Sequence, residues 1–226
     1  MKNILISFVS LLFLSSTVNA QMLIRDFVDL MEEWAVFNRS GINMPDYTGE
    51  PFLNSEFSEG TITTSEGIIY EKVPLRYNIY NDIFDFEKDG VSYTVDPVKY
   101  GLRVSIGSRQ FVWVDHNYNN IINKGYLELL ETGGYSLYKK YKVRYDRPQP
   151  AGAYSDSKPG NFFKLPFEYF LQELESGDIM FIPNEGKLLE LCGIHQQEVK
   201  AYIKEKRLKF RKENDLLEIV KFLNSL

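Results

Sequence analysis

A histidine beside an aspartate is the pair of residues with the clearest potential for chemistry in this chain. His116 follows Asp115 at the end of the apolar segment Trp113-Val114. A carboxylate that orients an imidazole could serve acid–base catalysis or metal binding. Neighbours along a strand point to opposite faces, however, so the Asp115 carboxylate would not meet the His116 ring. Because Tyr118-Asn119-Asn120 is typical of a turn, we predict a strand-end turn here and not a catalytic pair.

The other residues with reactive side chains also have structural explanations. His195 precedes Glu198 at an expected helix start, which predicts a solvated imidazole. The single cysteine, Cys192, falls beside Leu188 and Leu189 on an apolar face and is expected to be a small core residue. One thiolate cannot build a multi-cysteine zinc site. Because GxSxG, HExxH and a Gly-rich phosphate loop are also missing from the sequence, we predict no catalytic, cofactor-binding or metal-binding residues, no enzyme activity and no cofactor.

Carboxylates are plentiful in the stretch VPLRYNIYNDIFDFEKDGVSYTVDP, residues 73–97. A pair such as Asp82 and Asp85 could serve a glycosidase, but spacing in sequence does not show that two carboxylates flank one bond. The alternation of bulky and polar residues favours a half-buried sheet. We expect the tyrosines to place their hydroxyls in water and the aspartates to lie at turns or on the outer face: Tyr77, Tyr80, Tyr93, Asp82, Asp85, Asp89 and Asp96.

Charge is unevenly distributed along the chain. The chain has 26 Lys and Arg against 31 Asp and Glu, a net charge of −5, yet residues 200–212 hold seven cations and one acid. An acidic chain with one basic stretch is not typical of general nucleic-acid binding. Two interpretations of the stretch are open. It can neutralise an acidic face of its own sheet, which we favour, or it can contact an anionic partner such as lipid headgroups or a phosphate-bearing envelope polymer.

The hydrophobic periodicity predicts one amphipathic helix, many short strands and a helical end. The helix is expected over 24–38. Gly133-Gly134 and other turn residues separate the expected strands, which are 61–64, 68–73, 75–80, 83–86, 91–95, 102–106, 111–114, 126–131 and 135–145, with a hairpin of 167–174 and 178–182. Between them, residues 147–161 form a long loop, either functional or a plain connector.

The C-terminal segment 184–226 has the signals of several helices. Asn184 can cap a short helix over 187–192 that Gly193 closes. The last helix is expected to start at Asn214 or Asp215. Its residues Leu216, Val220 and Leu223 share one face, which predicts that the tail packs against the fold.

The first twenty residues have the organisation of an export signal. Lys2 precedes the apolar run 4–14, and the small residues Val18 and Ala20 stand where a signal peptidase cleaves. The run is too short for a stable membrane anchor. We predict a cleaved signal peptide over 1–20, a single β-rich domain over 21–226, and no transmembrane segment after cleavage.

Parts of the mature sequence resemble a known group of exported proteins. The phrase LRYNIYND at residues 75–82 and the lysine-rich ending KAYIKEKRLKFRKENDLLEIVKFLNSL are similar to uncharacterised secreted proteins of the Bacteroidota. This chain ends in Phe222-Leu223-Asn224-Ser225-Leu226, where the group more usually has tyrosines. The resemblance implies export and a strand-then-helix layout, and it supplies no activity.

The sequence therefore predicts an α+β fold, an antiparallel β-meander, curved or barrel-like, with one N-terminal helix and a helical C-terminal tail. The function we favour is a non-enzymatic binding or scaffolding protein of the cell envelope, periplasmic or extracellular. Its partner would be an envelope polymer or protein and not nucleic acid. The alternative is a glycan hydrolase whose carboxylates the sequence does not identify. A cleft with two convergent carboxylates favours the hydrolase, and an aromatic face or open edge favours the binder.

Overall fold

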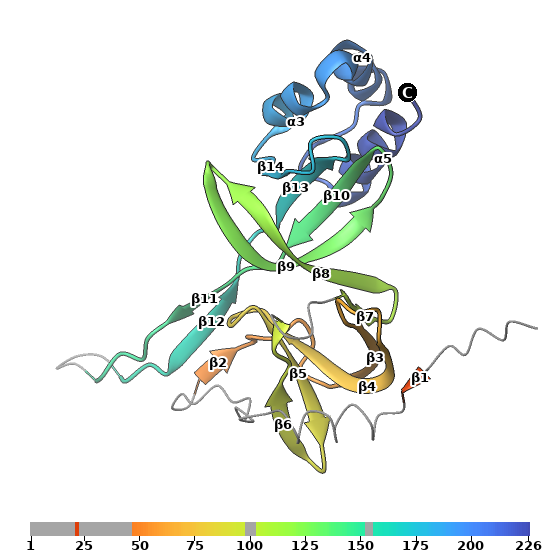
Figure 1. Ribbon diagram of the computed structural model, residues 1–226. Coiled ribbons are helices and arrows are strands. Elements are labelled where there is room, and N and C mark those ends of the chain that lie inside the picture. Colours follow the sequence, from red (N-terminus) through yellow and green to blue (C-terminus); the bar gives the residue numbers. More distant parts are fainter. Residues whose placement is uncertain (1–20, 23–46, 98–102, 152–155) are drawn as a thin grey trace, which may run out of the picture.

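Strands dominate the structure, and helices gather at one end of it (Figure 1). The computed structural model describes residues 21–22, 47–97, 103–151 and 156–226. The predicted α+β class is confirmed, and five strands close into a barrel. The helix predicted over 24–38 and the signal peptide predicted over 1–20 lie outside the described residues.

Eleven of the strands in the described part of the chain form one continuous sheet. Along it the order is β14-β13-β10-β9-β8-β7-β3-β4-β5-β6, with β1 pairing β4. Their bounds are β1 (Gln21–Met22), β3 (Ser58–Thr63), β4 (Ile69–Asn78), β5 (Ile83–Lys88), β6 (Val91–Thr94), β7 (Arg103–Ile106), β8 (Arg109–Tyr118), β9 (Ile121–Glu131), β10 (Tyr135–Lys140), β13 (Glu168–Glu173) and β14 (Ile179–Phe181).

The barrel occupies the part of this sheet nearest the helices. Strands β8, β9, β10 and β13 pair antiparallel, and β14 closes the ring by pairing parallel with β8 at Met180 and Asn117. Side chains fill the interior, as expected of a small barrel. Those buried there are Val112, Leu127, Tyr138, Phe170 and Ile179.

Strand β8 is longer than predicted, because its hairpin turn is tight. Asn119 and Asn120 have φ values of 51° and 69°, the left-handed conformation that asparagine tolerates in a two-residue hairpin turn. Pairing therefore continues to Tyr118 and Ile121. The predictions that the strands span 111–114 and 126–131 were too short, and His116 lies inside β8 rather than in a turn.

The lower part of the sheet, strands β7, β3, β4, β5 and β6, packs on an aromatic core. Strand β4 runs unbroken through Pro74, where two strands were predicted. A register shift opposite Gly60 and a positive φ at Lys72 form a bulge just before the proline, and pairing resumes beyond it. The aromatic side chains that fill this core are Tyr70, Tyr77, Phe84, Phe86, Phe111, Tyr126 and Tyr141.

A second, three-stranded sheet leaves the barrel beside β10. It consists of β11 (Val143–Asp146), β12 (Gly160–Lys164) and β2 (Tyr47–Gly49). The single strand predicted over 135–145 is therefore split. The chain leaves the barrel at Tyr141, whose ring turns into the lower core. The predicted loop 147–161 ends earlier than expected, at β12, and a bridge joins Gln149 and Lys158 within it.

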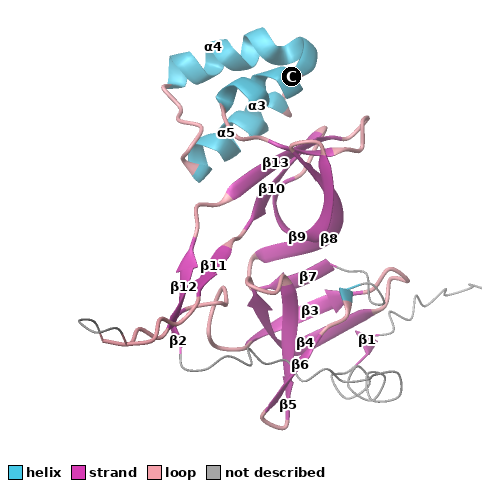
Figure 2. Ribbon diagram, turned by 90° about the vertical axis from the view of Figure 1, so that its left-hand side faces the viewer, coloured by secondary structure: helices cyan, strands magenta, loops and turns pink. Residues whose placement is uncertain are grey.

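Three helices cover the outer face of β10 and β13 (Figure 2). They are α3 (Glu185–Leu191), α4 (Gln196–Lys206) and α5 (Glu213–Leu223), with a 3-10 turn at Gly193–His195. The Asn184 side chain accepts a hydrogen bond from the Lys187 N–H, so the predicted cap is confirmed. Leu216, Val220 and Leu223 are buried against the barrel as predicted. Both views place α4 farthest from the lower sheet.

Candidate functional site

A pocket of about 300 Å³ lies where the barrel, the helical end and the lower part of the molecule meet. We call it the junction pocket. Its cationic residues come from β8, from β10 and the segment after it, and from the end of β12, and its one acid is the first residue of α5. The lining residues are Leu53, Ile79, Arg109, Lys139, Tyr141, Lys142, Lys164, Leu165, Phe167 and Glu213.

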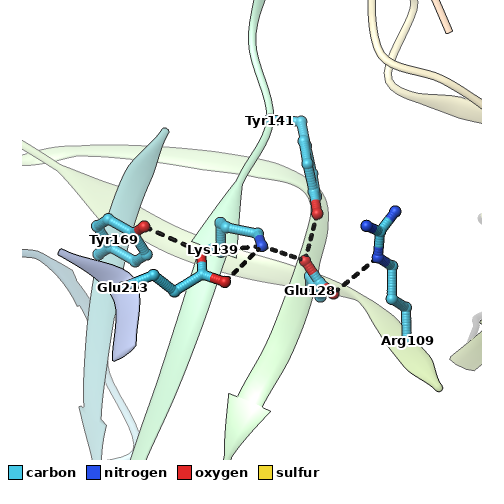
Figure 3. Close-up of polar contacts among 6 residues, drawn as sticks. All are labelled: Arg109, Glu128, Lys139, Tyr141, Tyr169 and Glu213. Atoms are coloured by element: carbon cyan, nitrogen blue, oxygen red, sulfur yellow. Dashed lines mark hydrogen bonds and ion pairs between the residues drawn. The ribbon is translucent and has the colours of Figure 1, made fainter. Parts of the chain in front are cut away.

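Lys139 is the buried centre of this site (Figure 3). Its Nζ lies 2.9 Å from Oε2 of Glu128 and 3.0 Å from Oε2 of Glu213. The Tyr141 hydroxyl donates to Oε2 of Glu128 at 2.6 Å, and the Tyr169 hydroxyl donates to Oε2 of Glu213 at 3.0 Å. The lysine thus joins a barrel carboxylate to a helix carboxylate, and both carboxylates receive further donors.

Burial and hydrogen bonding act in opposite directions on Lys139. Burial alone would lower the pKa of its ammonium, but hydrogen bonds to Glu128, Tyr141 and Glu213 raise that pKa well above the ordinary value for lysine. Burial, together with the hydrogen bond to Glu128, raises the pKa of Tyr141 to about 12. At neutral pH the lysine is therefore a fixed positive charge and the tyrosine a fixed hydrogen-bond donor.

Arg109 borders the pocket from the opposite side of Glu128. Its Nε lies 3.6 Å from Oε1 of Glu128, and its side chain is 44% exposed. Figure 3 shows the other two guanidinium nitrogens directed away from that carboxylate. The arginine consequently keeps donors for a ligand, because Glu128 engages only one edge of the guanidinium fork.

The lining of the junction pocket carries more positive than negative charge. Lys142 pairs with Glu168 at 2.7 Å, and Glu128 and Glu213 engage Lys139 and Arg109 as described above. In the described ranges no carboxylate lies within ion-pair distance of Lys164, at the exposed end of β12. Four cations thus face three carboxylates, so one positive charge remains for a ligand.

A second, partly buried ion pair lies on the other face of β10. Lys140 Nζ contacts Oδ2 of Asp82 at 2.5 Å, and the Tyr77 hydroxyl donates to Oδ1 of the same carboxylate at 2.5 Å. A Cβ at Gly125 would collide with both partners, so only glycine allows this approach. Tyr77 is buried, and burial and Asp82 raise the pKa of its hydroxyl. The expectation of a water-exposed Tyr77 hydroxyl was therefore wrong. Asp82, which the sequence left open as a glycosidase carboxylate, is engaged by Lys140 and Tyr77.

Asp85 was expected at a turn or on the outer face, and this expectation was wrong. The residue is fully buried in β5, where Arg76 Nη2 lies 3.4 Å from its Oδ2. The Arg76 guanidinium also stacks over Phe52 and Phe57, 3.7 Å and 4.4 Å from the ring centroids. Asp82 and Asp85 therefore each pair with a different cation, and among the interactions of the described residues none links these two carboxylates to each other.

The two residues of the Asp115-His116 pair point apart, as predicted for neighbours in a strand. Asp115 is exposed and lies 3.8 Å from Lys124. His116 is buried, with its ring edge-on to Phe170 at 5.0 Å and its Nδ1 3.2 Å from the Val114 carbonyl oxygen. Burial lowers the pKa of the imidazole below its usual value. The ring is a packed side chain of β8 and does not reach the junction pocket.

The remaining reactive side chains lie among the helices. His195 immediately precedes α4 and makes no capping hydrogen bond with its side chain. Cys192 is completely buried, its Sγ contacts the Leu188 carbonyl oxygen at 3.2 Å, and burial raises the pKa of the thiol to about 11. The position of His195 at the start of a helix and the burial of Cys192 agree with the sequence prediction, whereas the His195 side chain, expected in solvent, is half-buried.

The centre of the junction pocket was not predicted from the sequence, although Lys139 and Lys140 gave a signal. Two consecutive lysines inside the strand Tyr135–Lys140 must point to opposite faces. When both faces of a strand are covered, both lysines must find carboxylates inside the fold. Glu128 is the cross-strand neighbour of Lys139 in the β9–β10 hairpin. Glu213 and Asp82 are 74 and 58 positions away from their lysines, so those two pairs could not be assigned.

The basic stretch stays at the surface. All seven cations of residues 200–212 are exposed. Within the ranges that the structure describes, one of them forms an ion pair, Lys206 with its neighbour Glu205 at 3.3 Å. No described carboxylate of the sheet lies within ion-pair distance of this stretch.

The described residues contain no helix with the length and apolarity to cross a membrane. They also bring together no group of three His, Cys, Asp or Glu side chains suited to a metal ion. Comparisons with protein-family models, curated proteins and solved structures found no match to this chain.

Proposed function

We propose that this chain is an exported, non-enzymatic binding protein of the cell envelope, and that its junction pocket takes an amphipathic carboxylate. The carboxylate can belong to a small molecule or stand at the end of an envelope polymer or protein. The finer layout predicted from the sequence, an antiparallel meander between an N-terminal helix and a helical tail, belongs to the same proposal.

The observation that carries this proposal is the composition of the pocket wall. Four cations and Glu213 line it together with Leu53, Ile79, Leu165 and Phe167. Ligand pockets are mostly apolar with a few placed polar groups, and about 300 Å³ is the lower end of their usual range. One excess positive charge matches a single carboxylate, and the apolar side chains match a short hydrocarbon or aromatic body.

The fixed position of the Lys139 ammonium supports binding rather than catalysis. Lys139 is held by two carboxylates, so little side-chain freedom is lost when a ligand arrives. A glycan hydrolase needs one carboxyl group that keeps its proton near neutral pH. The two carboxylates at the centre of the site, Glu128 and Glu213, are both held by the Lys139 ammonium. The hydrolase alternative therefore has less support than the binder.

The test is a titration with hexanoate, followed by NMR chemical shifts of the full chain. We expect hexanoate to shift signals of pocket residues and n-hexanol to bind more weakly, because only the carboxylate can use the excess charge. Lys164→Gln should weaken hexanoate binding by about 2- to 5-fold, the effect of one exposed ion pair of up to roughly 1 kcal/mol.

The matched control is Lys158→Gln, which removes an exposed lysine outside the pocket. It should leave hexanoate affinity unchanged. Equal affinity for hexanoate and hexanol, or equal loss in the two lysine variants, would refute recognition of the carboxylate.

A further inference from the structure

The helical end presents a cluster of exposed cations that the junction pocket does not use. We call it the basic surface, and it consists of Lys200, Lys204, Lys206, Arg207, Lys209, Arg211 and Lys212. The first three lie on α4 and the others on the link between α4 and α5. Six consecutive residues of the link, 207–212, carry four of these cations and no acid.

Backbone contacts and apolar side chains hold the link in place. Leu208 and Phe210 are partly buried and pack on the core between the helices and the barrel. The Lys209 N–H donates to Oδ2 of Asp215 at 2.9 Å, and the Lys212 N–H donates to the Lys209 carbonyl oxygen at 2.9 Å. Because alternate residues point inward, Arg207, Lys209 and Arg211 project outward from a fixed backbone.

An apolar groove adjoins these cations. Phe210 and Arg211 line a cavity of about 600 Å³ together with residues of the barrel. Its other lining residues are Pro166, Phe167, Glu168, Tyr169, Phe181, Ile182 and Pro183. A partner that carries negative groups beside hydrocarbon fits this combination better than a purely polar polyanion does.

We propose that the basic surface docks the protein onto an anionic lipid surface. Juxtaposed Lys and Arg side chains are attracted to the negative headgroups of a leaflet, and the attraction grows with their number. The protein as a whole is acidic, but that charge does not prevent docking. The cations lie on α4 and on the link to α5, both at the helical end of the molecule (Figure 2). Repulsion from charges more than about 8–10 Å away is screened at physiological ionic strength.

This proposal does not depend on the ligand of the junction pocket. It also assigns the basic stretch to a partner rather than to the protein's own sheet. Internal neutralisation, the interpretation that the sequence favoured, would require ion pairs between these cations and sheet carboxylates, and the described residues form none.

Vesicle co-sedimentation of the full chain tests the proposal. We expect binding to vesicles of phosphatidylglycerol with phosphatidylcholine, little binding to phosphatidylcholine alone, and loss of binding as salt rises. The triple variant Lys209→Gln, Arg211→Gln, Lys212→Gln should weaken partitioning by about 100-fold, since each basic residue near such a surface contributes roughly fivefold.

The control variant Lys72→Gln, Lys124→Gln, Lys158→Gln makes the same change in net charge at exposed positions of the sheets. It should bind vesicles like the wild type, and both variants should keep the wild-type melting temperature. Failure to bind phosphatidylglycerol vesicles, or equal weakening by both triple variants, would overturn the proposal. Retention on immobilised polyphosphate without vesicle binding would overturn it in favour of a phosphate polymer.

Discussion

The helical end and the lower sheet are built from different side chains and are joined to the barrel in different ways. Between the helices and the barrel the core is mainly aliphatic, with leucines, isoleucines and valines from α3, α4 and α5. The lower core is mainly aromatic, and Tyr77 alone contacts the rings of Phe84, Phe111, Tyr126 and Tyr141. Two adjacent lysines of β10 connect these regions to the barrel.

Strand β10 takes part in two interfaces, one with the helices and one with the lower sheet. Lys139 faces the helices and pairs with Glu213 of α5, whereas Lys140 faces the other side and pairs with Asp82 from the turn between β4 and β5. Alternation along a strand places the two ammonium groups on opposite faces. Three kinds of variants separate the contributions of these regions to folding stability. They change the apolar contacts of α5, the two lysines of β10, and one buried imidazole, in order of decreasing expected effect.

The largest effect is expected from the apolar face of α5. Leu216 is completely buried and Leu223 is 2% exposed, both in the core between helices and barrel. Truncating a buried leucine to alanine typically costs about 2–5 kcal/mol. Leu216→Ala with Leu223→Ala should therefore remove much of the free energy of unfolding, measured by denaturant titration. The control is Leu226→Ala, because the Leu226 side chain is 50% exposed. An unchanged melting curve in the double variant would contradict the packing of α5 against the barrel.

The two lysines should differ in their effect on stability. Lys139→Met leaves the buried Glu128 carboxylate with only the half-exposed Arg109, 3.6 Å away, as a cation, and breaking a buried pair typically costs about 3–5 kcal/mol. Lys140→Met should cost about 1–2 kcal/mol, because Asp82 is 26% exposed and keeps its hydrogen bonds from Tyr77 and the Tyr126 N–H.

Chemical denaturation of both variants gives this comparison, and Glu128→Gln sharpens it. In the Lys139→Met background, Glu128→Gln should restore part of the lost stability, because it removes a buried charge whose close partner is gone. Equal losses for the two lysine variants would show that both pairs are equally accessible to solvent.

Local signals in the sequence predicted the helical end better than the sheet. The Asn184 cap and the spacing of Leu216, Val220 and Leu223 are properties of adjacent turns, and the structure confirms them. Strand β4 continues past Pro74 because a bulge forms opposite Gly60, and Gly60 belongs to another strand, β3. No pattern within residues 68–80 contains that information.

The candidate site was still less accessible to sequence reasoning. Its central contacts join Lys139 to Glu128 and to Glu213, and the latter pair is separated by 74 positions. Single residues of conventional catalytic type, such as His116 and Cys192, occupy packed positions. The Lys139–Glu128 pair forms within one hairpin, but the docking of α5, a long-range event, is needed to bring Glu213 to it.

The smallest effect concerns His116, which belongs to the barrel and not to either interface. Burial lowers the pKa of its imidazole, with Lys140 also lowering it, while the Val114 carbonyl oxygen, Asp82 and Asp115 raise it. A histidine whose pKa is lower in the folded state binds a proton more readily when the chain is unfolded. Stability from this residue is therefore complete above the unfolded pKa of about 6.5, and it is lost as pH falls below that value and through the lower pKa of the folded state.

Thermal unfolding between pH 7.5 and pH 5 should accordingly show a declining midpoint, and His116→Phe should make that decline shallower. The phenyl ring keeps a ring contact with Phe170 and removes the titrating group. His195→Gln is the matched control, because this histidine is half-buried at the start of α4 and makes no capping hydrogen bond. If the thermal midpoint of His116→Phe fell with pH as steeply as that of the wild type, His116 would not be the source of the acid sensitivity. The source would then lie at the interfaces of β10 and not inside the barrel.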